Sequence, residues 1–268
     1  MNASPSLQIA NDSGFPLQIA VERHVADTVR THGWKVRYSE HSWSNAAEGA
    51  SGFIDIVLQD SNETTFLVLE CKRVRDADWV FLPSDGKARS TNEAKIWFSH
   101  YVNGRTIQFD WMPQAVTPAS AVAHFCAIRG QSSSDKTNLL ERTAAELVLA
   151  TEALAFEDKN YRRDNHETLR TYFHAIVTTA RLKIGRFDPA QISLTDGALQ
   201  DAQFEDVPFV RLRKQLSKRP VTLTEQDGKN STDVAALKEN TVFVIRAEAL
   251  GSFLSQFQLI ESRRGSAV

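Results

Sequence analysis

Apolar and polar positions repeat with two different periods in the first part of the chain. From Pro16 to Gly33 the apolar residues recur every three or four positions, which predicts a helix that Gly33 ends. In three stretches the apolar residues either alternate with polar ones or follow one another directly, and this predicts strands at 34–40, 53–58 and 66–74. We therefore expect a helix followed by three strands.

The rest of the chain is expected to mix helices and strands. Residues 91–102 predict a helix with Ile96, Trp97 and Tyr101 on its apolar side, and residues 135–156 predict a longer helix. Further strands are expected at 121–128, 172–184, 209–216 and 241–247, with a short closing helix at 249–259. Because helices and strands alternate, the pattern indicates an α/β protein.

Length and composition are those of a globular protein with one elaborated domain or two small ones. The chain has 268 residues, of which 42% are hydrophobic and 24% charged, so it can fold without a disulfide or metal. We expect residues 1–13 to be a flexible N-terminus, residues 14–185 to form the core, and residues 186–268 to pack on it as an accessory region. No apolar run approaches the roughly 18 residues of a membrane-spanning helix, so no membrane partner is expected.

The net charge and the two cysteines bear on the partners of the protein and on its cellular compartment. The net charge is −2, so the average field does not attract nucleic acid, and local patches would have to hold a polyanion. Cys71 and Cys126 lie in apolar runs and do not have the spacing of a disulfide framework or a zinc site. Two buried free thiols favour a reducing cytoplasm.

Residues 52–74 carry the pattern with the clearest chemistry. Asp55 lies between two isoleucines in an otherwise apolar strand, where an unpaired carboxylate is costly. Glu70 and Lys72 share one face of the next strand, since side chains alternate. A hairpin places Asp55 opposite Val68 or, with a small slip, opposite Glu70, within about 4.5–8 Å. Two carboxylates this close repel each other, and a divalent cation such as Mg²⁺ removes that cost.

Structural explanations of the same residues stay open. Asp55 is compatible with a core carboxylate whose hydrogen bonds are satisfied, for example by Lys72. Glu70 and Lys72 are also typical of a surface ion pair at the end of a strand.

An Asp within an apolar strand, followed by Glu-x-Lys at the end of the next, resembles the PD-(D/E)xK nuclease superfamily. The resemblance spans residues 15–74, with Ile54 where the family pattern has Pro. It implies the restriction-endonuclease-like fold, a core of helix, three strands, helix and strand around a mixed sheet, here with a β-rich C-terminal accessory layer. Glu22 stands where the family often has a Glu on its first helix.

The resemblance implies a nuclease that hydrolyses phosphodiester bonds with Mg²⁺ or Mn²⁺. Asp55, Glu70 and the backbone carbonyl of Cys71 would hold the metal, and Glu22 would complete its shell. Lys72 would orient the attacking water and stabilise the charge that develops on the phosphate. It also implies DNA rather than RNA as substrate, a prokaryotic restriction or antiphage role, and either a homodimer or a regulatory partner protein.

Two pairs of basic residues are candidate contacts to the nucleic-acid backbone. Arg73 and Arg75 follow the motif, and Arg211 and Arg213 share one face of a later strand. A mixed-charge surface explains the first pair equally well, and a charged edge strand explains the second.

Two other functions stay open at this point. One is a non-catalytic nucleic-acid-binding or scaffolding module on a degenerate nuclease fold. The other is a hydrolase of sugars in which Asp55 and Glu70 share general acid and base work.

Overall fold

Strands dominate the fold. The computed structural model describes residues 4–75, 77–128, 139–160, 168–216, 235 and 238–260. Of these residues 50% lie in strands and 28% in helices. In chain order the strands are β1 (Lys35–Asn45), β2 (Ala50–Gln59), β3 (Thr65–Lys72), β4 (Asp78–Leu82), β5 (Ser90–Val102), β6 (Arg105–Ala123), β7 (Phe125–Ile128), β8 (Thr168–Thr178), β9 (Arg181–Arg186), β10 (Gln203–Val207), β11 (Phe209–Gln215), β12 (Glu239–Arg246) and β13 (Gln258–Ile260). The helices are α1 (Pro5–Asp12), α2 (Phe15–His32), α3 (Leu139–Asn160) and α5 (Leu250–Gln256), with short 3₁₀ turns η1 (Pro189–Gln191) and η2 (Ala247–Ala249).

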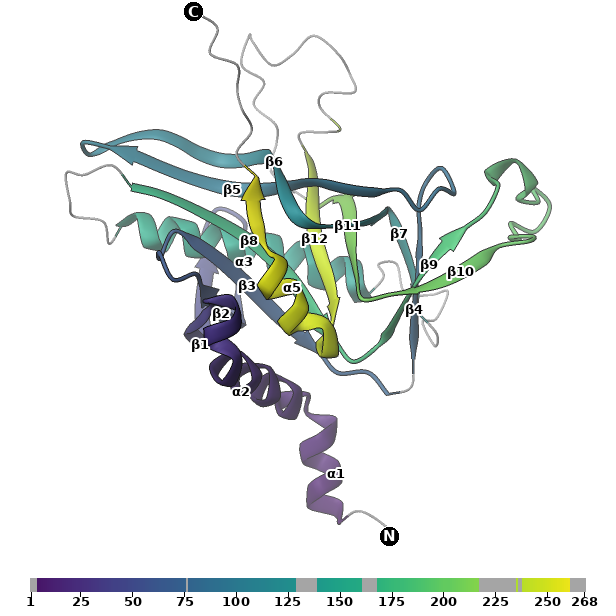
Figure 1. The fold of residues 1–268 in the computed structure, drawn as a ribbon, viewed down its shortest axis with the longest axis horizontal. Coiled ribbons are helices and arrows are strands. Elements are labelled where there is room, and N and C mark those ends of the chain that lie inside the picture. The colour runs from purple at the N-terminus through teal and green to yellow at the C-terminus, as the bar shows by residue number, and fades with distance from the viewer. Residues whose placement is uncertain are drawn as a thin grey trace, which may run out of the picture.

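The described strands form a large sheet and a smaller one. The large sheet has the order β1-β2-β3-β8-β12-β11-β6-β13, and β5 joins β6 to β8. Since β11 pairs with both β12 and β6, the strands β5, β6, β11, β12 and β8 close on one another in a ring within the described part of the chain. The smaller sheet has the order β10-β9-β4-β7 and extends from the large one (Figure 1).

The expected restriction-endonuclease-like α/β core is wrong. Residues in strands outnumber those in helices among the described residues, and a closed ring of strands replaces an open layered sheet. The expected C-terminal accessory layer is also wrong, because β12 lies inside the large sheet between β8 and β11. The C-terminal third therefore supplies central strands.

The helix expected at 91–102 is wrong as well, because these residues form β5. Ala94 and Ile96 pack into the core on one side of the strand, while Trp97 packs into the core on the other. A strand buried on both faces has consecutive apolar residues, which mimic the apolar face of a helix. Pairing of β5 with β6 along nearly its whole length decides the outcome.

The remaining predicted elements agree better with the structure. The helix expected from Pro16 to Gly33 is confirmed as α2, which Gly33 ends in the left-handed conformation with φ 78°. The long helix expected at 135–156 corresponds to α3, and residues 135–138 lie outside the described residues. The N-terminal segment, expected to be loosely ordered, contains α1, which Ser4 caps by accepting a hydrogen bond from the Leu7 N–H.

Helices cover both faces of the large sheet (Figure 1). On one face α2 and α5 pack through residues such as Val21, Val25 and Phe253. On the other face α3 packs through residues such as Ala144 and Leu147. Among the described residues, no helix is both long enough and apolar enough to cross a membrane.

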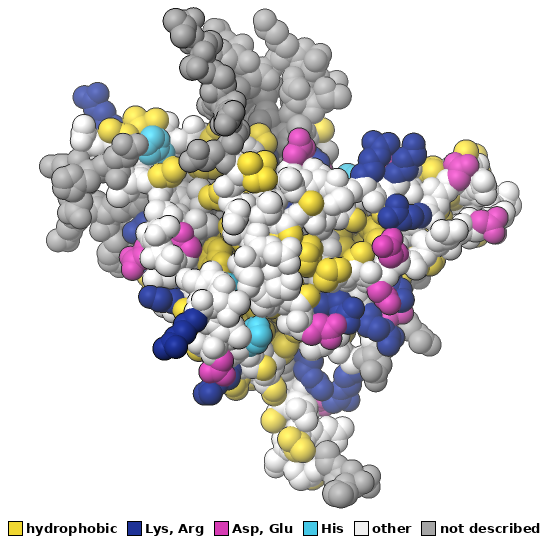
Figure 2. All heavy atoms as spheres, in the orientation of Figure 1, with side chains coloured by type: hydrophobic (Ala, Val, Ile, Leu, Met, Phe, Trp, Pro, Cys, Tyr) yellow, Lys and Arg dark blue, Asp and Glu magenta, His cyan; other side chains and the backbone are white. Residues whose placement is uncertain are grey.

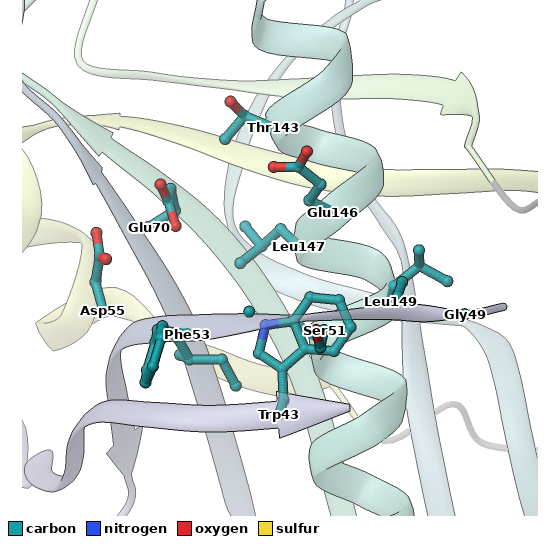
Figure 3. Close-up of a pocket in the computed structure, with 14 residues that line it drawn as sticks. Trp43, Gly49, Ser51, Phe53, Asp55, Glu70, Thr143, Glu146, Leu147 and Leu149 are labelled. Carbon is teal, nitrogen blue, oxygen red and sulfur yellow. The ribbon is translucent and has the colours of Figure 1, made fainter. Parts of the chain in front are cut away.

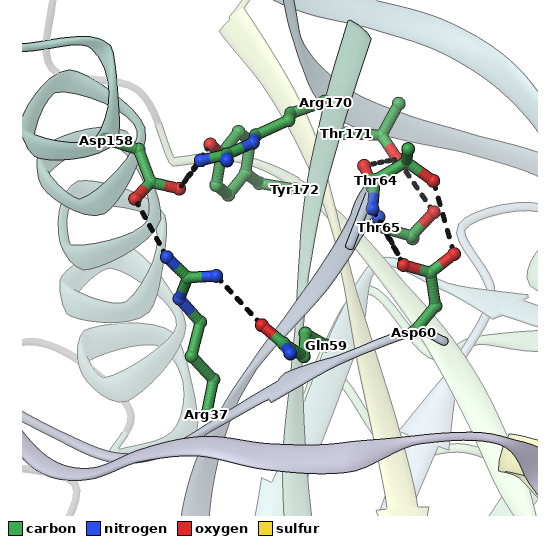
Figure 4. Close-up of polar contacts among 9 residues, drawn as sticks. All are labelled: Arg37, Gln59, Asp60, Thr64, Thr65, Asp158, Arg170, Thr171 and Tyr172. Carbon is green, nitrogen blue, oxygen red and sulfur yellow. Dashed lines mark hydrogen bonds and ion pairs between the residues drawn. The ribbon is translucent and has the colours of Figure 1, made fainter. Parts of the chain in front are cut away.

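A buried carboxylate fixes the C-terminal end of α3 against the sheet. Asp158 Oδ2 accepts a hydrogen bond of 2.7 Å from the Tyr172 hydroxyl and lies 3.0 Å from the Arg170 guanidinium (Figure 4). Arg37 on β1 lies 3.7 Å from the other oxygen of Asp158. These contacts join α3 to β1 and β8, and so hold the helix in place over the strands that carry the candidate site.

Candidate functional site

The β2–β3 hairpin brings Asp55 and Glu70 together. Ile56 pairs with Leu69 and Val57 with Val68. Continuing this register by one pair sets Asp55 opposite Glu70, the second of the two registers that the sequence allowed. The two carboxylates are therefore cross-strand neighbours.

The turn between β2 and β3 sets this register. Asp60 Oδ1 accepts hydrogen bonds from the backbone N–H groups of Thr64 (2.8 Å) and Thr65 (2.9 Å), as Figure 4 shows. The Asp60 N–H in turn donates to the Thr65 carbonyl at 3.0 Å. A short acidic residue that caps its own turn is a typical local signal, and it fixes which residues face each other along the hairpin.

Short polar contacts hold the side chains of the site. Asp55 Oδ2 accepts a hydrogen bond of 2.7 Å from the Cys71 backbone N–H. Lys72 Nζ lies 2.5 Å from Glu70 Oε1, so the amine and the two carboxylates gather at the end of the hairpin. The Cys71 side chain packs into the core beside α2, on the face opposite to Glu70 and Lys72, as the strand alternation predicts.

The carboxylates lie in the wall of a cavity of about 540 Å³ between β2 and α3. Trp43 and Phe53 line it from the β1–β2 side, and Thr143 and Glu146 line it from α3. Figure 3 shows Asp55 and Glu70 on one side of this space and α3 across from them. The α3 residues could not be predicted from the sequence, since nothing in a helical pattern indicates which distant strand the helix covers.

Burial makes the charge on Asp55 costly. The pKa of this carboxyl is raised to about 6, mainly by desolvation and secondly by the nearby Glu70 carboxylate. The Cys71 N–H and the Lys72 amine act in the opposite direction. The pKa of the Cys71 thiol is also raised, first by burial and then by Asp55 and Glu70. The site thus has an excess of negative charge that a cation would relieve.

Glu22 lies beside the site without joining the carboxylate pair. The Gln18 amide donates both to Glu22 Oε1 (3.3 Å) and to the backbone carbonyl of Asp55 (3.1 Å), and so connects α2 to β2. Glu22 also contributes to the raised pKa of the Cys71 thiol. Glu22 is not among the residues that line the cavity with Asp55 and Glu70, and its role toward a metal stays a prediction.

The available donors suit a hard divalent ion. The described residues contain no group of three or more His, Cys, Asp and Glu side chains that could hold a metal. If Asp55 and Glu70 were ligands of such an ion, a backbone carbonyl, water molecules and the substrate would fill most of its coordination shell. Mg²⁺ typically keeps several waters and takes one or two carboxylates, so this donor set fits Mg²⁺ or Mn²⁺.

The candidate basic contacts are largely engaged within the protein. Arg73 donates to the carbonyl of Asn11, and Arg75 pairs with Asp12 at the end of α1. On the face that Figure 2 shows, Lys and Arg side chains are interspersed with Asp and Glu. This arrangement agrees with the mixed-charge explanation of the pair that follows the motif.

The expected basic stripe on β11 is wrong for Arg211, which is 0% exposed. Its guanidinium donates to the carbonyls of Val116 and Pro118 at 2.7 and 3.0 Å and lies 4.9 Å from the Phe243 ring centre. Burial lowers the pKa of Arg211 to about 10. Arg213 is partly exposed and pairs with Glu239 at 3.0 Å. Arg211 is thus a structural residue of the closed ring.

Comparison with known proteins returns no family model, no curated protein and no solved structure that matches the chain. The interpretation of the site therefore depends on its own geometry. The resemblance of the Asp55 and Glu70-x-Lys72 pattern to the PD-(D/E)xK nucleases stays a prediction about chemistry.

Proposed function

We propose that this protein is a metal-dependent nuclease that hydrolyses phosphodiester bonds, with DNA as the preferred substrate. The observation that carries the proposal is the cavity wall that Asp55 and Glu70 share at the end of the β2–β3 hairpin, where Asp55 accepts a hydrogen bond from the Cys71 N–H and Lys72 is ion-paired to Glu70. The proposal depends on the chemistry of these side chains and not on a nuclease fold.

The three residues have separate roles. Asp55 and Glu70 would hold Mg²⁺ or Mn²⁺, together with the backbone carbonyl of Cys71. A bound ion of this kind lowers the pKa of a coordinated water and offsets the charge that builds on the phosphate. The Cys71 N–H fixes one oxygen of Asp55, so the carboxylate is oriented before a ligand arrives.

Lys72 supplies a cation next to the carboxylate pair. Its side chain is 35% exposed, so its amine can reach both a water near Glu70 and an incoming phosphate. A compact ammonium with three donors suits both tasks. We expect Lys72 to orient the attacking water and to stabilise the negative charge of the transition state.

The cysteines and the motif resemblance suggest a cellular setting for this activity. Cys71 and Cys126 are both free and buried, which agrees with activity in a reducing cytoplasm. A prokaryotic restriction or antiphage system, with a second copy or a regulatory protein as partner, is the setting that the motif resemblance suggests.

The test is a cleavage assay on plasmid DNA, single-stranded DNA and RNA with EDTA, Mg²⁺ or Mn²⁺. Wild type should cleave only with metal, and Lys72→Ala should lose at least 100-fold in rate, in the range of lost transition-state charge stabilisation. Lys183→Ala is a matched control, because Lys183 on β9 is 27% exposed and pairs with Asp206 at 2.9 Å. It should keep the wild-type rate.

Two results would contradict the proposal. Cleavage that persists in EDTA would contradict the dependence of the reaction on a metal ion. Binding of nucleic acid without turnover in any metal would favour the non-catalytic alternative.

A further inference from the structure

The proposed reaction centre is recessed, and this limits which substrates can reach it. Asp55 and Glu70 lie in the wall of the 540 Å³ cavity, and α3 forms the wall across from them (Figure 3). A volume of this size is typical of a pocket that encloses a small ligand. A base inside a stacked duplex cannot enter such a pocket unless its nucleotide leaves the stack.

An exposed aromatic ring stands next to the carboxylates. Phe53 is 65% exposed and lines the same cavity as Asp55. It precedes Asp55 by two positions on β2, and both residues line the cavity. Aromatic rings of this kind stack on bases of any sequence, provided that the base is unpaired.

The charges of the cavity favour a base over a phosphate. Asp55, Glu70 and the exposed Glu146 on α3 all line it. A phosphate would be repelled except where a cation balances the carboxylates, whereas a base is neutral. Leu147 and Ala150 add apolar surface, and Thr143 and Glu146 offer polar atoms to the edge of a base.

We propose that the cavity between β2 and α3 receives one unpaired base, so that the substrate is single-stranded or locally unpaired nucleic acid and not a continuous duplex. This inference rests on the proposed nuclease function, because the phosphate next to that base would lie at Asp55 and Glu70. Phe53 stacks on the base and positions the nucleotide.

The experiment compares three labelled DNA substrates of one sequence: a single strand, a blunt duplex, and a duplex with a central unpaired bubble. Binding is measured in EDTA and in Ca²⁺ by fluorescence polarisation, and cleavage is measured in Mg²⁺ and Mn²⁺. Wild type is compared with Phe53→Ala and with Glu146→Trp, which fills the cavity from an exposed position on α3. Phe204→Ala is the control, since Phe204 is also exposed (47%) but lies on β10 of the small sheet.

The expected result is binding and cleavage of the single strand and the bubble in preference to the blunt duplex. Phe53→Ala should weaken binding to unpaired DNA about tenfold, which is the size of one lost base–aromatic stack, and Glu146→Trp should weaken it at least as much. Phe204→Ala should behave as wild type.

The outcomes separate this inference from the proposed function. Metal-dependent cleavage of the blunt duplex as fast as of the single strand would overturn the base pocket and leave the nuclease proposal standing. A preference for unpaired DNA that depends on Phe53, with no cleavage in any metal, would support the pocket and contradict the nuclease. Equal binding to all three substrates without cleavage would overturn both.

Discussion

Asp55 Oδ2 accepts a hydrogen bond of 2.7 Å from the backbone N–H of Cys71, the residue between Glu70 and Lys72. This bond ties β2 to the strand that carries the other two residues of the candidate site. It also holds the Asp55 carboxylate in a position where burial and the Glu70 charge both disfavour ionisation. The arrangement is therefore costly in the absence of a cation, and this cost is measurable.

Asp55→Asn should stabilise the metal-free protein at pH 7. The pKa of Asp55 is about 6 in the folded state, above the ordinary value of 3.8, so the folded state binds the proton more tightly than the unfolded state. The free energy of unfolding of wild type should then fall as pH rises from about 4 to about 6. Asparagine keeps an acceptor for the Cys71 N–H and removes the charge, so we expect a gain of about 1–3 kcal/mol at pH 7.

Urea unfolding in EDTA at pH 4 and pH 7 checks this expectation. The difference between Asp55→Asn and wild type should be near zero at pH 4 and fully present at pH 7. A variant that is less stable than wild type at pH 7 would show that the charged carboxylate stabilises the fold.

Asp60→Ala should destabilise the β2–β3 hairpin. Two backbone N–H groups, of Thr64 and Thr65, lose their acceptor, which costs about 1–2 kcal/mol. Thermal unfolding measures the loss, and Asp60→Asn is the matched control because its amide oxygen still accepts hydrogen bonds. Equal loss in both variants would mean that the charge of Asp60, and not its role as an acceptor, holds the turn.

Arg211 and Arg213 should respond very differently to substitution. Arg211→Ala removes a buried guanidinium and leaves the carbonyls of Val116 and Pro118 without their donor, so we expect a loss of about 3–5 kcal/mol. Arg213→Ala breaks a partly exposed pair with Glu239 and should cost about 0–1 kcal/mol. Urea unfolding of both variants makes the comparison, and near-equal losses would contradict the structural role of Arg211.

The elements that could be predicted from sequence are those set by neighbours in the chain. Helix α2 has an apolar stripe and a glycine stop, and the β2–β3 hairpin has alternating strands around the Asp60 turn. The same local logic places Asp55, Glu70 and Lys72 at one end of the hairpin.

The elements that could not be predicted depend on distant pairing. Both faces of strand β5 are buried, so its apolar residues follow one another as they do on the apolar face of a helix. Its secondary structure is set by pairing with β6 and β8. Arg211 lies on a charged segment and is nevertheless enclosed, since β6 and β12 flank β11. The cavity needs α3, whose position over β2 no local pattern indicates.

Calorimetric titration of metal-free protein with Mn²⁺ tests the central claim most directly, because it asks whether Asp55 and Glu70 hold a divalent ion. Wild type should bind Mn²⁺ at one site, and Asp55→Asn and Glu70→Gln should each bind at least tenfold more weakly while Lys183→Ala binds as wild type does. Mn²⁺ binding of unchanged affinity in both Asp55→Asn and Glu70→Gln would contradict the account.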